Sequence, residues 1–198
     1  MNTPLAERMR PKLLKDYFGQ EHLVGTNGSL TQMIENDIFP SLIFWGPPGT
    51  GKTTLASLLA NEKDRPFYQL SAINSGVKEI RDIISKAEHS GDLFSGKSPI
   101  LFIDEIHRFS KSQQDSLLNA VEKGTITLIG ATTENPSFEV INALLSRCQV
   151  YILNPLEKKD LEKILISALQ TDTQLKDKSI KIKESDALIE LAGGDARK

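Results

Sequence analysis

The sequence predicts an α/β fold: a parallel five-stranded sheet flanked by helices and followed by the start of a small all-helical subdomain. Five apolar runs are too short for helices and have the length of buried strands. Amphipathic stretches separate these runs, and strands that alternate with helices form parallel sheets. After Asn154-Pro155 only helical patterns remain. The predicted strands are Ser41–Trp45, 67–70, 100–103, 126–129 and 150–153.

The predicted helices are recognised by apolar residues that recur on one face. The clearest is Val77–His89, and the next, 111–123, has Gly124 as a C-terminal stop signal. The remaining predicted helices span 52–60, 157–170 and 184–192, and a charged loop spans 171–183.

We expect the chain to consist of two parts. Residues 1–154 would form the α/β core, and residues 155–198 would form part of a helical lid. The chain stops at Ala196-Arg197-Lys198, just after a Gly-Gly pair where a further helix could begin. We therefore expect a truncated form of a longer protein.

Composition indicates an ordinary globular protein. Hydrophobic residues make up 39% and charged residues 25% of the 198 residues, which argues against a disordered or fibrous chain. The formal net charge of −2 argues against attraction of the whole surface to nucleic acid, so any such contact needs a local basic patch. The single Cys148 and the polar first residues favour a reducing cytosol. The apolar runs are far too short to span a bilayer.

A glycine-rich turn joins the first strand to the helix after it. Its sequence, Gly46-Pro47-Pro48-Gly49-Thr50-Gly51-Lys52-Thr53, is a complete phosphate-binding loop between strand and helix. The glycines let backbone N–H groups close around phosphates, the helix N-terminus adds its dipole, and Lys52 reaches the terminal phosphates. Thr53 would supply a hydroxyl ligand to Mg²⁺, and Thr54 would complete the nucleotide-binding set. The loop predicts ATP binding rather than a turn that binds nothing.

Two carboxylates follow the strand 100–103. Asp104 and Glu105 are therefore expected at the C-terminal edge of the sheet, where α/β proteins bind ligands. Asp104 would hold the Mg²⁺ shell, and Glu105 would orient and polarise the water that attacks the γ-phosphate. The alternative is two exposed acids that cap a helix, which is less attractive beside a phosphate loop.

The strand 126–129 leads to the same edge. It ends in Gly130-Ala131-Thr132-Thr133-Glu134-Asn135, so hydroxyl and amide side chains follow it. Such groups can hydrogen-bond a γ-phosphate or an attacking water. Taken alone, however, a Thr-Thr pair after a strand is more often turn chemistry.

Together these motifs resemble the N-terminal ATPase part of the AAA+ ATPases of the clamp-loader-like branch, and within that branch the replication-associated recombination ATPases. The most specific matching segment is Thr132-Thr133-Glu134-Asn135-Pro136-Ser137-Phe138. The resemblance spans nearly the whole chain. The other matching segments are Arg10-Pro11, Gly19-Gln20-Glu21-His22-Leu23, the phosphate loop, Asp104-Glu105-Ile106-His107-Arg108-Phe109 with Lys111-Ser112-Gln113-Gln114-Asp115, Ser146-Arg147-Cys148 and Gly194-Asp195-Ala196-Arg197.

The resemblance implies roles for further residues. Thr133, rather than Thr132, would be the sensor on the third strand of the nucleotide site. Arg147 would be an arginine finger that projects into a neighbouring subunit's site, which implies a homo-oligomer. Arg197 would be the second sensor arginine, which reaches the γ-phosphate from the lid of its own subunit. The residues that would flank the adenine are Arg10, Pro11, Phe18, Gly19 and Gln20.

Other interpretations of three residues stay open. An arginine such as Arg147 is, taken alone, more often a surface ion-pair residue, and Arg197 lies at a chain end that can fray. For His107 we favour a packing or orienting role over proton transfer.

By the same resemblance, DNA contacts would follow the second strand, within residues 71–81. Lys78 and Arg81 lie three residues apart on one helix face and could meet successive backbone phosphates without sequence readout. A solvated charged face that includes Glu79 and Asp82 is the alternative. The segment contains no aromatic residue, which argues against a machine that pulls on polypeptide.

The leading hypothesis is an ATP-hydrolysing module of a DNA-associated motor or loader in replication-fork maintenance, recombination and DNA repair. Its cofactors would be ATP and Mg²⁺. Its partners would be DNA with single-strand/double-strand junctions or ends, and replication and repair proteins, in the bacterial cytoplasm at the nucleoid. The alternatives are a nucleotide-gated assembly switch and a Holliday-junction branch-migration motor. A small-molecule kinase would explain neither Glu105 nor Arg147.

Overall fold

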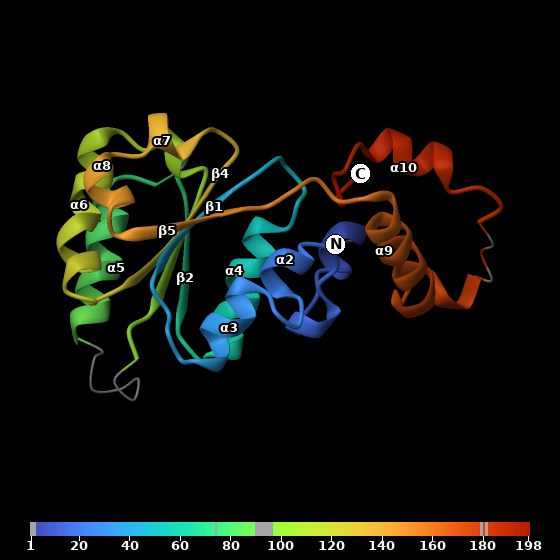
Figure 1. Cartoon of the computed structure of the whole chain (residues 1–198), viewed down its shortest axis with the longest axis horizontal. Coiled ribbons are helices and arrows are strands. Elements are labelled where there is room, and N and C mark those ends of the chain that lie inside the picture. Colours follow the sequence, from blue (N-terminus) through green and yellow to red (C-terminus); the bar gives the residue numbers. More distant parts are fainter. Residues whose placement is uncertain (1–2, 74, 90–96, 179, 181) are drawn as a thin grey trace.

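The computed structural model describes residues 3–73, 75–89, 97–178, 180 and 182–198 of the chain. Its core is a five-stranded sheet with the strand order β2-β3-β4-β1-β5, in which every neighbouring pair is parallel (Figure 1). This architecture confirms the predicted fold class. The strands are β1 (Ser41–Trp45), β2 (Phe67–Ser71), β3 (Ile100–Asp104), β4 (Thr127–Thr132) and β5 (Cys148–Ile152).

Helices cover both faces of the sheet (Figure 1). Successive side chains of a strand point to opposite faces, so Ile43 packs into one core while Leu42 and Phe44 pack into the other. The central strands β3 and β4 are therefore almost continuously apolar. One face carries α5 (Val77–His89), α6 (Lys111–Glu122) and α8 (Asn142–Leu145), and the other carries α2 (Glu21–Val24), α3 (Ser29–Glu35) and α4 (Lys52–Glu62).

Both ends of α6 carry local capping signals, of which we predicted only Gly124. Ser110 and Gln113 form a capping box, in which the hydroxyl of Ser110 accepts from the N–H of Gln113 and the amide oxygen of Gln113 accepts from the N–H of Ser110. Gly124 has a φ of +68° just after the helix, in the left-handed region that ends helices and favours glycine.

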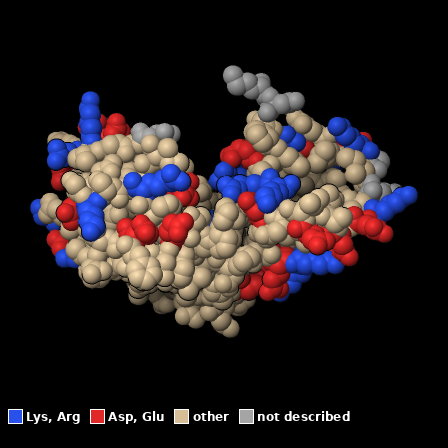
Figure 2. All heavy atoms as spheres, turned by 90° about the horizontal axis from the view of Figure 1, so that it is seen from above, with Lys and Arg blue, Asp and Glu red and all other residues tan. Residues whose placement is uncertain are grey.

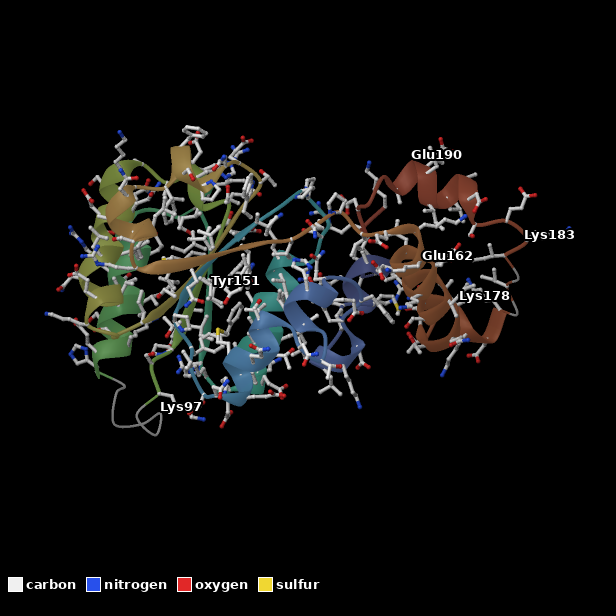
Figure 3. The ribbon with its side chains drawn as sticks, in the orientation of Figure 1. Lys97, Tyr151, Glu162, Lys178, Lys183 and Glu190 are labelled. Carbon is white, nitrogen blue, oxygen red and sulfur yellow. The ribbon has the colours of Figure 1, made fainter. Side chains whose placement is uncertain are left out.

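In the described part of the chain, three helical elements follow β5, and we keep the name lid for this predicted helical part. They are α9 (Lys158–Thr171), η3 (Lys176–Lys178) and α10 (Asp186–Ala192). Figure 3 shows Glu162 on α9 and Glu190 on α10, with Lys178 and Lys183 toward the outer end of the lid, and Lys97 and Tyr151 in the sheet part. Residues 179 and 181, within the predicted loop 171–183, lie outside the described part of the chain.

The N-terminal segment lies between the sheet and the lid (Figure 1). Its helices are too short to be detected by periodicity, and we predicted none of them. The start of β5 also differs from the prediction, since the strand begins at Cys148 rather than at residue 150. The remaining short elements are α1 (Leu5–Arg8), η1 (Leu14–Asp16), η2 (Ile106–Arg108) and α7 (Pro136–Glu139). Within the described residues, no helix has the length and hydropathy needed to cross a membrane.

Candidate active site

A cavity of about 880 Å³ opens between the sheet and the lid. Figure 2 shows the hollow between two lobes, with lysine and arginine atoms gathered along its wall. The N-terminal segment, the glycine-rich loop, the ends of β3 and β4, α9 and the C-terminal segment all contribute lining residues. The cavity therefore lies at the C-terminal edge of the parallel sheet, the usual ligand site of such folds.

The glycine-rich loop has a backbone conformation that favours glycine. Gly49 and Gly51 have φ values of +73° and +93°. A Cβ atom on Gly51 would lie 2.4 Å from the hydroxyl oxygen of Tyr17, and one on Gly46 would lie 2.2 Å from the carbonyl oxygen of Leu153. The glycines therefore serve both the loop conformation and its close packing.

Lys52 begins α4 and folds back over the loop. Its Nζ donates to the carbonyl oxygens of Gly46 and Pro47, each at 2.7 Å. Burial lowers the pKa of Lys52, while the nearby Glu105 and Asp104 act in the opposite direction. The ammonium group is thus held inside the loop, where it can exchange two carbonyl contacts for phosphate oxygens.

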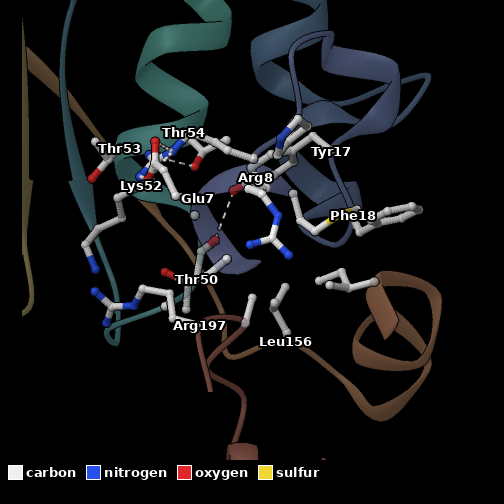
Figure 4. Close-up of a pocket in the computed structure, with 18 of the residues that line it drawn as sticks. Glu7, Arg8, Tyr17, Phe18, Thr50, Lys52, Thr53, Thr54, Leu156 and Arg197 are labelled. Atoms are coloured by element: carbon white, nitrogen blue, oxygen red, sulfur yellow. Dashed lines mark hydrogen bonds and ion pairs between the residues drawn. The ribbon is translucent and has the colours of Figure 1, made fainter. Parts of the chain in front are cut away.

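Two further hydrogen bonds fix the loop. The hydroxyl of Thr50 donates to the carbonyl of Pro47 at 3.0 Å. The hydroxyl of Tyr17 donates to the carbonyl of Thr50 at 3.0 Å (Figure 4). Burial raises the pKa of Tyr17 well above its usual value, so the phenol stays a donor at any physiological pH. We did not predict Tyr17, because its role depends on packing against the loop.

The predicted carboxylates both line the cavity. Asp104 is the last residue of β3, and Glu105 follows it with a φ of +55°. A left-handed backbone is unusual for a residue other than glycine and is often found at functional sites. Glu105 Oε2 lies 3.3 Å from Nε2 of His107 and 3.9 Å from Nε of Arg108.

The two threonines after β4 have different surroundings. Thr133 lines the cavity, whereas Thr132 is fully buried and does not. The hydroxyl oxygen of Thr132 accepts from the N–H of Glu134 at 3.0 Å. This arrangement agrees with the expectation that Thr133 is the residue exposed to a phosphate.

The C-terminal segment closes one side of the cavity. Arg197 lines it and points to the same region as Lys52 in Figure 4. Its guanidinium is paired with Asp195 at 3.1 Å, and this hydrogen bond raises the pKa of Arg197. The N–H of Ala196 donates to the carbonyl of Gly49 at 3.2 Å. The lid thus contacts the glycine-rich loop directly.

The residues predicted to flank the adenine divide into two groups. Arg10, Pro11 and Phe18 line the cavity, and Arg10 donates to the hydroxyl of Thr54 at 3.3 Å. Apolar lining residues that we did not predict, Leu156 and Ile164, come from the lid.

Gly19 and Gln20 lie outside the cavity wall. Gln20 is buried, and its side-chain amide pairs with the backbone of Asn154, donating at 2.7 Å and accepting at 2.9 Å. A Cβ atom on Gly19 would lie 2.6 Å from Cδ2 of Leu156. Both residues therefore contact the connection between β5 and the lid. Gly46 and Pro47 of the loop are not among the lining residues either, whereas the cavity is lined by Pro48, Gly49, Thr50, Gly51, Lys52, Thr53 and Thr54.

Three other predicted residues lie outside the cavity. Arg147 follows α8 and forms an ion pair with Glu122. Lys78 and Arg81 are exposed on α5, and residue 74 of the same predicted segment lies outside the described residues. Arg147 therefore contributes nothing to the cavity of its own chain.

The oxygen ligands available for Mg²⁺ are few. The described residues contain no group of three His, Cys, Asp or Glu side chains that could hold a metal. Thr53 and Asp104 line the same cavity, and Mg²⁺ commonly takes one or two protein oxygens together with phosphates and water. The site therefore fits a cation that arrives with a nucleotide.

A strand, a glycine-rich loop and a helix that present a lysine near two carboxylates define a P-loop nucleotide-binding protein. Residues 42–156 match the sequence profile of the ATPase family associated with various cellular activities (AAA). The match covers more than half of the chain, and the chain belongs to this family.

Several longer proteins are similar to this chain in sequence. Replication-associated recombination protein A of Escherichia coli (strain K12) is 48% identical over 198 residues, which cover 98% of this chain and 44% of that protein. ATPase WRNIP1 of Dictyostelium discoideum is also 48% identical, over 98% of this chain and 22% of its own length. The chain thus spans less than half the length of these relatives.

Solved structures share the fold. The Holliday junction branch migration motor RuvB of Thermotoga maritima superposes with a TM-score of 0.71 at 29% identity, covering 96% of this chain and 62% of that one. A variant of the same protein gives a TM-score of 0.73 at 28% identity, with the same coverage.

Proposed function

We propose that this chain is the ATP-hydrolysing module of a DNA-associated motor or loader that acts in replication-fork maintenance, recombination and DNA repair. The observation that carries the ATPase assignment is the convergence on one cavity of a P-loop lysine, two strand-end carboxylates, a threonine and a lid arginine. These residues are Lys52, Asp104, Glu105, Thr133 and Arg197.

The residues divide the work of hydrolysis. Backbone N–H groups of the loop and Lys52 bind the β- and γ-phosphates, and Thr133 and Arg197 contact the γ-phosphate. Glu105 orients the water and accepts its proton as the water attacks the γ-phosphorus. Thr53 and Asp104 would hold Mg²⁺, which would supply charge neutralisation at the phosphate oxygens.

The lid and the neighbouring subunit complete the site. We assign residues 1–154 to the nucleotide-binding core and residues 155–198 to a partial lid. Arg147 lies outside its own cavity and therefore has to act on a second copy of the chain if it contacts ATP. This supports a homo-oligomer, in which Arg147 stabilises the charge on the transferred phosphoryl group.

The DNA-associated role rests on the relatives. The name of replication-associated recombination protein A refers to replication and recombination, and that protein is similar to this chain over nearly all of the chain's length. Lys78 and Arg81, both exposed on α5, are the residues that we assign to the DNA backbone.

ATP turnover with and without DNA tests the proposal. We expect hydrolysis that rises when DNA with single-strand/double-strand junctions or ends is added, and we expect Glu105→Gln to reduce it strongly. ATP turnover that DNA leaves unchanged would indicate a nucleotide-gated switch instead, in which hydrolysis only resets the assembly. If Glu105→Gln turns over ATP at the wild-type rate, the assignment of Glu105 is wrong.

A second candidate is branch migration of Holliday junctions. The observation that favours it is the structural similarity to RuvB over 96% of this chain. A four-way junction distinguishes the two functions, because a branch-migration motor converts it to duplex products in an ATP-dependent way, whereas stimulation by DNA ends alone supports the first function.

A further inference from the structure

His107 connects the acidic end of β3 to the end of β4. Its Nε2 lies 3.3 Å from Oε2 of Glu105, and its Nδ1 lies 3.0 Å from Oγ1 of Thr132. The His107 side chain is only 12% exposed, and Thr132 is completely buried. Neither residue lines the cavity, but Glu105 and Thr133 do. The imidazole therefore lies outside the cavity and connects Glu105, which lines it, with Thr132, the neighbour of the lining residue Thr133.

The donors and acceptors of this chain of contacts allow two arrangements. A carboxylate can only accept, so in both of them Nε2 of His107 carries a hydrogen that faces Oε2 of Glu105. In a neutral imidazole Nδ1 is then an acceptor, and the hydroxyl of Thr132 donates to it. In a doubly protonated imidazole Nδ1 donates to the hydroxyl of Thr132, which donates in turn to the carbonyl of Glu134 at 3.1 Å. The contact between His107 and Thr132 is kept in both arrangements.

The contacts link two groups that a nucleotide would meet separately. Thr132 immediately precedes Thr133, so a ligand that moves the backbone at Thr133 also moves the hydroxyl of Thr132. That hydroxyl holds one side of the imidazole, and the other side holds the carboxylate of Glu105. The direction of the carboxylate therefore depends on the position of the β4 end.

We propose that His107 is a positioning residue, which sets the orientation of the Glu105 carboxylate from the end of β4. The inference rests on the proposed hydrolysis, in which Glu105 orients the attacking water. Orientation of that water matters in the transition state and contributes nothing to ATP binding. Loss of His107 therefore lowers kcat and leaves KM for ATP unchanged.

Steady-state ATP hydrolysis by three variants of the protein provides the test. We expect His107→Ala to lower kcat by about 10- to 100-fold, the scale of a misplaced catalytic group, with KM within about 2-fold. His107→Gln can place an amide N–H near the position of Nε2 and should recover much of the rate. His107→Asn reaches only toward Thr132 and should remain slow. His89→Ala is the matched control, because His89 is exposed on α5 with its ring on the carbonyl of Ser85.

A double variant separates action through Glu105 from a general structural effect. In the Glu105→Gln background, measured by single turnover, His107→Ala should cause little further loss. An equal loss in both backgrounds, a higher KM with unchanged kcat, or equal rates for the Gln and Asn variants would each overturn the assignment of His107. These outcomes leave the proposed ATPase intact. A wild-type protein that does not hydrolyse ATP would overturn both the proposed ATPase and the positioning role of His107.

Discussion

Arg8 and Asp172 form a two-point ion pair across the cavity, with Nε 2.7 Å from Oδ2 and Nη2 2.9 Å from Oδ1. They are 164 residues apart in sequence, and they join the helix α1 to the end of α9. The carboxylate of Asp172 is almost fully buried, and both residues line the cavity. The pair thus fixes the lid against the N-terminal segment at the wall of the cavity.

Asp172→Asn should therefore destabilise the lid in a pH-dependent way. The hydrogen bond from Arg8 lowers the pKa of Asp172 below its usual value of about 4. A carboxyl whose pKa is lower in the folded state adds stability above its unfolded pKa, and this contribution is lost as the pH falls through the folded pKa. The stability difference between wild type and Asp172→Asn should be constant from pH 7 to about 5 and shrink below about 4.

Denaturant unfolding at several pH values measures this difference. Asp177→Asn is the control, because Asp177 is exposed on η3, and it should follow the wild type throughout. A difference that grows on acidification would contradict a depressed pKa at Asp172.

Gln20 should affect stability more than nucleotide affinity. Its amide satisfies both the N–H and the carbonyl of Asn154, so Gln20→Ala leaves these groups without that partner. We expect the free energy of unfolding to fall by about 1–3 kcal/mol. Each kcal/mol should lower Tm by about 2 to 4 °C. ATP affinity, measured by titration calorimetry, should change by less than about 3-fold, which is under 1 kcal/mol, because Gln20 does not line the cavity. A large affinity loss at unchanged Tm would instead support the adenine-flanking role inferred from resemblance.

The sheet was predictable because its residues carry the information locally. Apolar runs such as Ser41–Trp45 and the stop signal Gly124 after α6 act within a few residues, and the structure confirms these elements. The N-terminal helices were not predictable, since helices of three or four residues are stabilised by tertiary contacts rather than by periodicity. The partners of Gln20 and Arg8 lie more than a hundred residues away, beyond any sequence pattern.

The candidate site was predictable where a motif fixes both residue type and spacing. The loop and the Asp104-Glu105 pair reach one cavity because parallel strands bring their C-terminal ends together. The contribution of Tyr17 was not visible, because it depends on a phenol packed against Gly51. For His107 we favoured a packing or orienting role, but its two contacts are known only once β3 and β4 are adjacent.

Lys52→Met should separate nucleotide binding from folding. The variant keeps the apolar stem but removes the ammonium group that contacts phosphates, so ATP affinity should fall by about 10- to 100-fold. The change in unfolding free energy should stay within about 1 kcal/mol, because two hydrogen bonds to carbonyls are lost while the cost of burying a charge disappears. Fluorescent ATP titration and thermal unfolding measure the two effects, with exposed Lys86→Met as control. Unchanged affinity would contradict the phosphate role of Lys52.

Arg147→Ala should abolish turnover and spare ATP binding, because Arg147 lies outside the cavity of its own chain and is expected to act on a neighbour. The loss should be about 10³-fold or more. Lys123→Ala is the control and should hydrolyse ATP normally. Lys123 is exposed at the end of α6, which covers the same face of the sheet as α8.

Mixing two inactive variants tests the action between subunits. An assembly of Arg147→Ala and Glu105→Gln chains contains some sites in which an intact Glu105 faces an intact Arg147 from the adjacent copy. In a closed assembly mixed one to one, chance pairing makes about a quarter of the sites complete, and turnover should recover to about that fraction of the wild-type rate. An Arg147 that acted within its own chain would give no recovery, because every site would then lack either Glu105 or Arg147. Recovery therefore distinguishes a composite site from one built by a single chain, and hydrolysis by Arg147→Ala alone would contradict the finger in either form.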